Sequence, residues 1–314
     1  MCNRICKDLP LRIGTRSSAL ALAQAHEVRT LLMQVHNLPI DAFEIVPIST
    51  EGDRIASSSL AFMGGKGLFT KEIEMALQEG HIDIAVHSTK DMPVILPDNL
   101  HLSVYLKRED PRDAFIGKTI EHIRDLPYGA SIGSSSTRRQ AQIHRIRPDL
   151  NIVPYRGNIQ TRLAGLTQKD IAGTLLALAG LKRLHLQAVV TEIMDPEYFL
   201  PTPGQGVIVV ESRTDDSKTN AFIKPLADVN THYEMTCERV FMATLDGSCR
   251  MPLGGLAKIR GDKIYFSGMI MTLDGRISYE INLHGFFCDA AEIGKNAAEK
   301  LKKDAGSSFF ENWV

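Results

Sequence analysis

The N-terminal two thirds of the sequence alternate strand-like segments with amphipathic helical segments, and this alternation restricts the fold more than any other feature. A strand is predicted at 11–16, and a helix that carries an apolar stripe follows it at 18–35. The stripe consists of Leu20, Val28, Leu31, Leu32 and Val35. A second unit combines a helix over 69–80, which ends at Gly80, with a strand over 81–88. The alternation predicts an α/β fold whose parallel or mixed sheet is covered by helices.

The alternation resumes at residue 129 and stops near residue 228. Between these points, the segment 201–212 predicts a turn followed by a strand that returns to the first domain. We expect three domains, two of them α/β: residues 8–107 with 204–226, residues 108–203, and residues 227–314.

The C-terminal part predicts a small α+β domain. A helix over 231–245 begins with Thr231 and Glu234 in the spacing of a capping box, and the last helix begins at Asp289 with Glu292 in the same relation. Two strand-like stretches, 263–273 and 276–285, flank the dipeptide Asp274–Gly275, which is a strong hairpin signal.

Composition and charge exclude several classes of partner. Hydrophobic residues make up 44% of the chain and charged residues 23%, with a formal net charge of −1. No overall field therefore attracts the molecule to nucleic acid or to an anionic membrane. The longest apolar run, 175–181, is too short to cross a bilayer, and the N-terminus shows no signal peptide. We expect a cytoplasmic protein whose five cysteines are reduced, with no metal site.

The segment 131–169 is strongly basic and contains a single acid, Asp149. Its basic residues are Arg138, Arg139, Arg145, Arg147, Arg156, Arg162 and Lys169. We interpret Arg145 and Arg147 as a solvated helix face. The other four arginines stand at element starts or in a glycine-containing loop, where bidentate binding of carboxylate or phosphate is favoured. Because the segment contains one aromatic residue, Tyr155, a small, multiply anionic ligand fits better than single-stranded nucleic acid.

The dipeptide Lys90–Asp91 follows a predicted strand, at the edge where open α/β sheets place their ligands. It is either a loop salt bridge or the position of a catalytic carboxylate. The neighbouring His87 is interpreted as a structural hydrogen-bonding residue. The glycine-rich stretches 64–70 and 203–206 lack required positions of nucleotide-binding motifs, so no nucleotide cofactor is expected.

Cys249 stands in the turn-rich stretch "GSCRMPLGG" beside Arg250. A thiol in such a loop, near a cationic group, is exposed and reactive in many proteins. We interpret Cys237 and Cys288 instead as small buried hydrophobes. The residues alone thus indicate a thiol able to hold a group covalently, a carboxylate at a strand end and an arginine-rich anion site.

Ten strings of residues, running in order from about residue 11 to 256, together resemble the porphobilinogen deaminase family. They are "LRIGTRSSALALAQA", "GGKGLFTKEIEMAL", "DIAVHSTKDMP", "REDPRDAF", "GSSSTRRQAQ", "RPDL", "RGNIQTRL", "LALAGLKRL", "PGQG" and "LDGSCRMPLGG". The resemblance implies two α/β domains of the periplasmic-binding-protein type and a third α+β domain. It implies a monomeric transferase that joins four porphobilinogen molecules head to tail, releases ammonia at each step and yields linear hydroxymethylbilane.

The same resemblance implies residue roles. Cys249 would carry a dipyrromethane cofactor through a thioether, and Asp91 would stabilise the electron-poor azafulvene and take part in proton transfer. Cofactor-binding residues would be Lys90, Ser134, Arg138, Arg139, Arg162 and Arg183. Substrate-binding residues would be Arg16, Ser18 and Arg156. Each pyrrole carries an acetate and a propionate, so arginines would form charge-assisted hydrogen bonds worth roughly 1.5 to 3 kcal/mol each.

The segment 54–63, in which Phe62 replaces a lysine of some relatives, matches a loop that lies over the family's cleft. Two other interpretations are a non-catalytic solute-binding module for a small polyanion and a thiol-dependent hydrolase. The first class is normally exported, and the second requires a base near Cys249 that the sequence does not identify.

Overall fold

A computed structural model describes residues 9–54, 70–245 and 251–311. The chain forms two compact units. Unit 1 draws on Met1–Arg108 and Val207–His232, and unit 2 on Glu109–Gly206 and Tyr233–Val314. The three-domain division with the boundaries given above stays a prediction.

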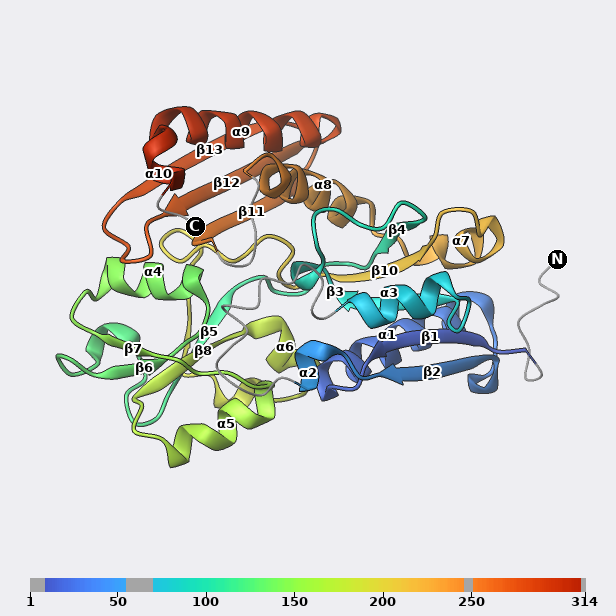
Figure 1. The fold of residues 1–314 in the computed structure, drawn as a ribbon, viewed down its shortest axis with the longest axis horizontal. Coiled ribbons are helices and arrows are strands. Elements are labelled where there is room, and N and C mark those ends of the chain that lie inside the picture. Colours follow the sequence, from blue (N-terminus) through green and yellow to red (C-terminus); the bar gives the residue numbers. More distant parts are fainter. Residues whose placement is uncertain (1–8, 55–69, 246–250, 312–314) are drawn as a thin grey trace. The chain divides into compact units, whose positions relative to one another are not determined.

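Unit 1 contains a mixed five-stranded sheet with the order β2-β1-β3-β10-β4 (Figure 1). Its strands are β1 (Leu11–Arg16), β2 (Phe43–Ile48), β3 (Ile84–Ser88), β4 (Leu100–Tyr105) and β10 (Ile208–Arg213). β1 runs parallel to both β2 and β3, whereas β10 pairs antiparallel with β3 and β4. The strand predicted after residue 201 is β10, and it lies inside this sheet.

The helices of unit 1 follow the predicted alternation. They are α1 (Ala19–His36), α2 (Glu51–Arg54), α3 (Lys71–Gln78) and α7 (Ser217–Ile223), with 3-10 turns at Ile40–Ala42, Thr89–Asp91 and Lys224–Leu226. The stripe predicted for α1 is partly wrong, because Val35 is 49% exposed. Residues spaced by three and four positions, Ala21, Ala25, Val28 and Leu32, are the ones buried. Ala21 and Ala25 pack on the sheet together with Val28 and Leu32 of the predicted stripe, whereas Leu20 and Leu31 are only half-buried.

Unit 2 contains a second mixed sheet with the order β7-β6-β8-β5-β9. Its strands are β5 (Asp113–Gly117), β6 (Ser131–Gly133), β7 (Asn151–Val153), β8 (Gly173–Ala177) and β9 (Glu192–Ile193). Three helices belong to it, α4 (Thr137–Ile146), α5 (Ile159–Gln168) and α6 (Leu178–Arg183), with 3-10 turns at Ile123–Asp125 and Gln187–Val189. β6 is parallel to β7 and β8, and β5 is antiparallel to β8 and β9. The predicted α/β fold is confirmed in both units.

The C-terminal part of unit 2 is an antiparallel sheet with the order β11-β12-β13 and three associated helices. The strands are β11 (Leu253–Arg260), β12 (Lys263–Met271) and β13 (Ser278–Phe286). The helices are α8 (Val229–Thr244), α9 (Ala290–Ala305) and α10 (Ser307–Glu311), with a 3-10 turn at Phe287–Asp289. The predicted hairpin is confirmed: β12 and β13 are antiparallel and joined by a turn in which Gly275 has a φ of +68°.

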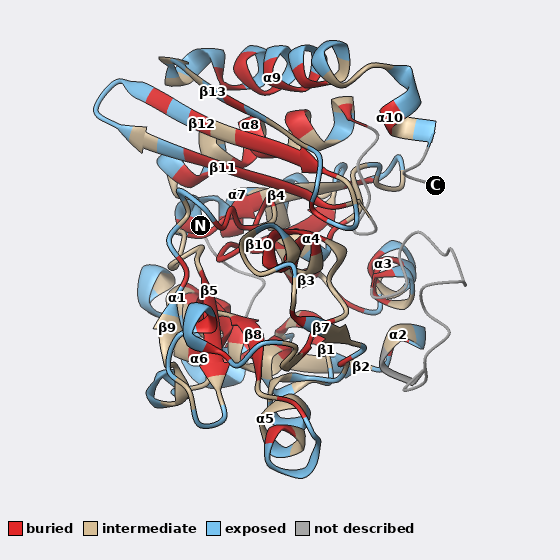
Figure 2. Cartoon of the chain, turned by 90° about the vertical axis from the view of Figure 1, so that its left-hand side faces the viewer, coloured by how far each residue is buried: buried red, intermediate tan, exposed pale blue. Residues whose placement is uncertain are grey.

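One face of this antiparallel sheet is buried, and the other is buried at the end of β12 but exposed along much of β13 (Figure 2). On one face, Phe241 of α8 packs edge-on against Phe266 of β12 with ring centroids 4.8 Å apart. On the other face, Met269 joins a buried cluster that includes Ala141 of α4. The two sheets of unit 2 therefore share apolar contacts.

Both predicted capping boxes are wrong. α8 begins at Val229, two residues before Thr231, and Asp228 accepts a hydrogen bond from the Thr231 backbone N–H at 2.8 Å. The Glu234 carboxylate instead accepts from the Ile259 backbone N–H at 3.1 Å. α9 does begin after Asp289, but the Asp289 side chain makes no capping hydrogen bond. Across the described ranges, every helix is too short or too polar to span a membrane.

Candidate functional site

The pocket of unit 1 lies at the carboxyl ends of β1 and β3. These strands are parallel neighbours, so their ends meet at the same sheet edge. Arg16 ends β1, Ser18 is the N-cap of α1, and Asp91 closes the 3-10 turn that follows β3. The lining residues are Arg16, Ser18, Leu20, Ala21, Gln24, Thr70, Val86, His87, Ser88 and Asp91. The structure thus brings together three predicted site residues, and Lys90 lies beside Asp91 in the turn.

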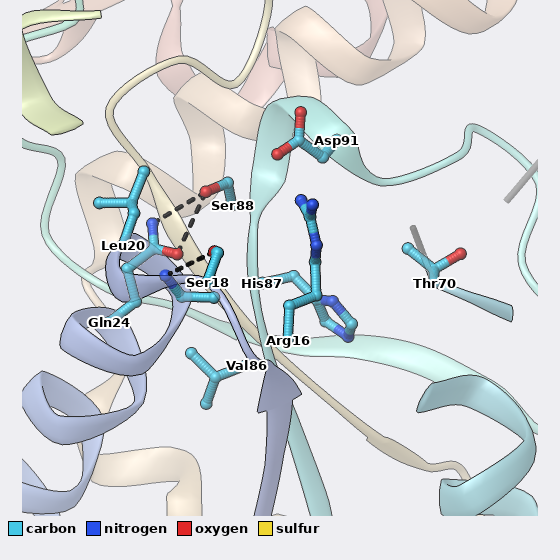
Figure 3. A pocket seen from close by; sticks show the side chains of 10 residues that line it. Arg16, Ser18, Leu20, Gln24, Thr70, Val86, His87, Ser88 and Asp91 are labelled. Carbon is cyan, nitrogen blue, oxygen red and sulfur yellow. Dashed lines mark hydrogen bonds between the residues drawn. The ribbon is translucent and has the colours of Figure 1, made fainter. Parts of the chain in front are cut away.

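The polar side chains of this pocket are arranged in a defined way (Figure 3). The Arg16 guanidinium extends toward the exposed Asp91 carboxylate. The Gln24 amide donates to the Ser88 hydroxyl at 2.9 Å, and the Ser18 hydroxyl accepts from the Ala21 backbone N–H at 3.3 Å. A cation and an anion therefore stand at one opening, where a substrate that carries both carboxylates and N–H groups finds complementary partners.

Two buried carboxylic acids near this pocket were missed by the sequence reasoning. His87 is buried, and its Nε2 lies 3.1 Å from Oε2 of Glu211, which is fully buried. Glu74 of α3 is also buried, and its pKa is raised by that burial and by the nearby Glu211. A sequence signal exists for each: Glu74 stands beside the apolar residue Ile73, and Glu211 ends an apolar run.

In unit 2 the predicted anion-binding arginines Arg138 and Arg139 have a carboxylate partner inside the protein. Both are nearly buried, at 4% and 7% exposure, and both bind Asp113 of β5. Arg138 Nη2 lies 2.7 Å from one Asp113 oxygen, and Arg139 Nη2 lies 2.6 Å from the other. Although burial alone raises the pKa of Asp113, the two guanidiniums hold it at about 2.

Each of these arginines also donates to a backbone oxygen, whereas the buried Arg138 Nε has no hydrogen-bond partner. Arg138 Nη1 donates to the Leu200 carbonyl at 2.6 Å, and Arg139 Nη1 donates to the Leu175 carbonyl at 2.9 Å. The Ser136 hydroxyl caps α4 by accepting from the Arg139 backbone N–H at 3.4 Å. Two cations share one carboxylate, so this group keeps one positive charge in excess. The ligand-binding role of the pair stays a prediction.

Further cations lie close to this group. Burial, together with the charges of Arg139 and Arg156, lowers the pKa of Arg162 to about 10. The Arg162 Nε donates to the Gly157 carbonyl at 3.1 Å. Like charges held this close favour an anionic ligand, because a carboxylate relieves their repulsion. The residues present therefore fit a polycarboxylate such as a dipyrromethane.

The other predicted residues of unit 2 are placed as follows. Ser134 is buried beside the start of α4, where its hydroxyl accepts from the Ser136 backbone N–H at 3.3 Å. Arg183 is at the end of α6 and donates to the Gly206 carbonyl at 3.1 Å. The interpretation of Arg147 as solvated is wrong, since it binds Asp149 and the Leu126 carbonyl, at 2.6 and 2.9 Å. Arg145 is partly exposed and pairs with Glu280.

The cysteines differ in environment. Cys249 and the segment 55–63, which includes Phe62, lie outside the described residues. Cys237 is fully buried, as expected, and burial raises the pKa of its thiol. Cys288 is exposed, so its interpretation as a buried hydrophobe is wrong. In the part of the chain that the structure describes, His, Cys, Asp and Glu side chains form no group of three or more that could hold a metal ion.

Comparison with solved structures finds weak likenesses to binding proteins. The methionine-binding protein MetQ is 13% identical, with 69% of this chain and 89% of that chain covered at a TM-score of 0.44. A periplasmic substrate-binding protein of an ABC transporter from Coxiella burnetii is 14% identical, with 69% and 91% covered at a TM-score of 0.41. Likenesses of this size add no argument about function.

Sequence comparison is decisive. Residues 11–221 match the family model described as "Porphobilinogen deaminase, dipyromethane cofactor binding domain", and residues 232–303 match "Porphobilinogen deaminase, C-terminal domain". The porphobilinogen deaminase of Nitrobacter hamburgensis is 50% identical over 303 residues, which cover 96% of each chain. Identity of this extent, together with both family models, shows that the chain belongs to the porphobilinogen deaminase family.

Proposed function

We propose that the pocket of Arg16, Ser18 and Asp91 and the arginine group of unit 2 carry the family's reaction in this chain. The reaction itself follows from the family: the chain is a hydroxymethylbilane synthase, a transferase of tetrapyrrole biosynthesis with a dipyrromethane cofactor. It condenses four porphobilinogen molecules head to tail and releases ammonia at each step.

Asp91 is the proposed catalytic residue. When ammonia leaves the substrate, positive charge develops on the pyrrole, and a fixed carboxylate stabilises that charge. Asp91 is exposed at a strand end beside Arg16, which supports this role. The observation that carries the assignment is that Asp91 lines one pocket with Arg16 and Ser18, from which it is distant in the sequence. Arg16, Ser18 and Arg156 are the proposed partners of the substrate's acetate and propionate.

The cofactor is proposed to be held by a thioether to Cys249 and by polar contacts of its carboxylates. When bound, it supplies the pyrrole carbon to which the first substrate is joined. The proposed contacts come from Lys90, Ser134, Arg138, Arg139, Arg162 and Arg183. The lowered pKa of Arg162 supports this role, because burial and then the neighbouring cations Arg139 and Arg156 lower it.

The remaining proposals concern the protein's surroundings. Porphobilinogen and the growing polypyrrole are its proposed partners, and neither nucleic acid nor a membrane is among them. The formal net charge of −1 supports the exclusion of nucleic acid and of an anionic membrane, since no overall field attracts either of them. A cytoplasmic monomer is proposed.

The experiment that tests the cofactor site is the intact mass of the purified chain beside that of Cys249→Ser. The expected mass excess equals two condensed pyrrole units and disappears in the variant. Cys288→Ser is the matched control, because Cys288 is an exposed thiol outside the proposed site and its loss should leave the excess unchanged. A chain found without the excess is incubated with porphobilinogen and weighed again. A mass that still does not increase overturns the proposal.

A further inference from the structure

Three ionisable side chains are buried together at the pocket of unit 1. His87 of β3 is 5% exposed, Glu211 of β10 is 0% and Glu74 of α3 is 9%. Removing such groups from water costs several kcal/mol each unless they are paired. The apolar residues of α3, Ile73 and Leu77, pack in the adjoining core cluster. Apolar side chains would fill this space without that loss of hydration free energy. The burial of three ionisable groups therefore requires a functional explanation.

Strand register explains how these groups meet. Glu211 pairs with Ala85 in the antiparallel ladder, so its side chain lies on the same sheet face as Ala85 and His87. The Ala85 face is also the face that α3 covers, which brings Glu74 to the cluster. Among the described residues, Arg16 from β1 and Asp91 from the turn after β3 are the other charged groups that line the same pocket as His87 (Figure 3).

The hydrogen bond to Glu211 determines which nitrogen of His87 is basic. A carboxylate accepts from an N–H group, so Nε2 carries the proton that binds Oε2 of Glu211 at 3.1 Å. In the neutral ring, Nδ1 then holds the lone pair. Because His87 lines the pocket and its Nε2 is bound to Glu211, Nδ1 is the ring nitrogen left to exchange a proton with that space.

The reaction requires a proton acceptor. In each condensation the C–N bond of the substrate's aminomethyl group breaks, and its electron pair leaves with ammonia. A C–C bond then forms between the substrate methylene and the α-carbon of the terminal pyrrole. The C–H bond at that α-carbon breaks, and its electron pair restores the aromatic ring. One proton is therefore released per step, while Asp91 must stay ionised to stabilise the developing positive charge.

We propose that His87 accepts this α-carbon proton through Nδ1, and that Glu211 is the positioning residue that keeps Nδ1 basic. The resulting imidazolium forms an ion pair with Glu211, and the released ammonia takes the proton away as ammonium. Burial and the neighbouring Glu211 raise the pKa of Glu74, so ionising both carboxyl groups in this cluster is disfavoured. This inference rests on the proposed site around Asp91.

The test compares His87→Asn with the wild type, using porphobilinogen that carries deuterium at its free α-position. The expected result is a fall in kcat of about 100-fold or more, typical of a lost general base, with little change in KM. C–H cleavage then limits the rate, so the deuterium isotope effect on kcat increases. Glu211→Gln keeps a hydrogen-bonding group but removes the charge, and should show a smaller fall and a pH–rate profile displaced from that of the wild type.

His101→Asn is the matched control. His101 lies on β4 of the same sheet and bonds Ser212 and Asn220, at 3.1 and 3.3 Å, outside the pocket. It should keep the wild-type rate and isotope effect. All variants are first compared by thermal melting and by the mass of the bound cofactor, so that a general loss of structure is recognised.

The outcomes separate the two proposals. A His87→Asn enzyme with wild-type kcat and isotope effect overturns the role of His87, even where Asp91→Asn is inactive. An active Asp91→Asn enzyme overturns the proposed site instead. If His87→Asn does not fold, the ¹⁵N chemical shifts of the His87 ring in the wild type decide. A neutral ring protonated at Nε2 supports the proposal, whereas a ring protonated at Nδ1 overturns it.

Discussion

Asp113 binds two arginines that the sequence presents as ligand-binding residues. The arginine-rich segment contains a single acid, Asp149, so the sequence predicts an open anion site. Asp113 lies outside that segment, on β5. It reaches Arg138 and Arg139 of α4 only because β5 belongs to the same sheet as β6, the strand that precedes α4. The pairing of these arginines with a distant carboxylate could not be predicted from the local sequence, because it depends on which strands share a sheet.

Asp113→Asn should lower stability in a pH-dependent way. The folded pKa of about 2 lies below the unfolded value near 3.9, so ionised Asp113 stabilises the fold by about 2 to 3 kcal/mol above roughly pH 5. This contribution decreases as the pH falls toward 2. At pH 7 the variant should lose about 3 to 5 kcal/mol, because two buried cations lose their partner. Urea unfolding at pH 7 and pH 3 measures the difference. A wild-type advantage that is equal at both pH values contradicts the prediction.

Asp91→Asn should reduce condensation by at least about 100-fold and leave the fold intact, because the amide keeps the shape of the side chain and removes its charge. Steady-state turnover and circular dichroism measure the two parts. Asp98→Asn is the control, since Asp98 is an exposed carboxylate in the loop that follows the same strand. Near-normal turnover of Asp91→Asn would refute the catalytic role.

The contents of the pocket were predictable only in part. The place of Asp91 at a sheet edge follows from the predicted strand before it, whereas Arg16 and Ser18 were named only through the resemblance to the family; the structure brings all three to one pocket. Glu74 and Glu211 were missed because an acid in an apolar stretch does not reveal whether it faces solvent or a neighbouring strand. Their burial depends on the register between β3 and β10, which sequence periodicity does not determine.

At the level of elements, periodicity identified the strands and helices better than it identified their ends. The predicted strand at 11–16 coincides with β1, and the helix at 18–35 differs from α1 by one residue at each end. The start of α8 was predicted two residues too late. Thr231 does not cap the helix, because its hydroxyl accepts a hydrogen bond from the distant Arg108 backbone N–H at 3.0 Å. A capping motif is a local signal, and a distant backbone group competes for the same side chain.

Gly294→Ala should destabilise the packing of α9 on α8. A Cβ at this position would lie 2.2 Å from the Cys237 carbonyl oxygen, and backbone cannot move aside as a flexible side chain does. Overpacking of this kind costs about 1 to 3 kcal/mol, more than the gain in helix propensity from glycine to alanine. Chemical unfolding measures it. Asn296→Ala, at an exposed position of the same helix, should be neutral or slightly stabilising, and equal stability of the two variants would contradict the close contact.

Considered as a whole, the molecule should gain stability when its cofactor is attached. Arg139 and Arg156 both repel Arg162, and carboxylates placed among them remove this repulsion. The loaded wild type should therefore melt several degrees above the Cys249→Ser chain, and the difference should shrink in about 0.5 M salt, which screens interactions between charges more than roughly 4 Å apart. Thermal melts at low and high salt measure this. Identical melting temperatures at low salt would contradict a ligand bound by these arginines.

The position of β10 has a consequence for biosynthesis. β10 lies between β3 and β4 but is encoded roughly 100 residues after β4, an interval that a ribosome translates in about 5 to 20 s. During that interval β4 lacks the strand it pairs with, and β3 keeps an open edge of the kind that promotes aggregation. Unit 1 therefore completes its sheet only after all the strands of the α/β part of unit 2 have been synthesised. A nascent chain that stops before Val207 exposes two strands that chaperones must shield.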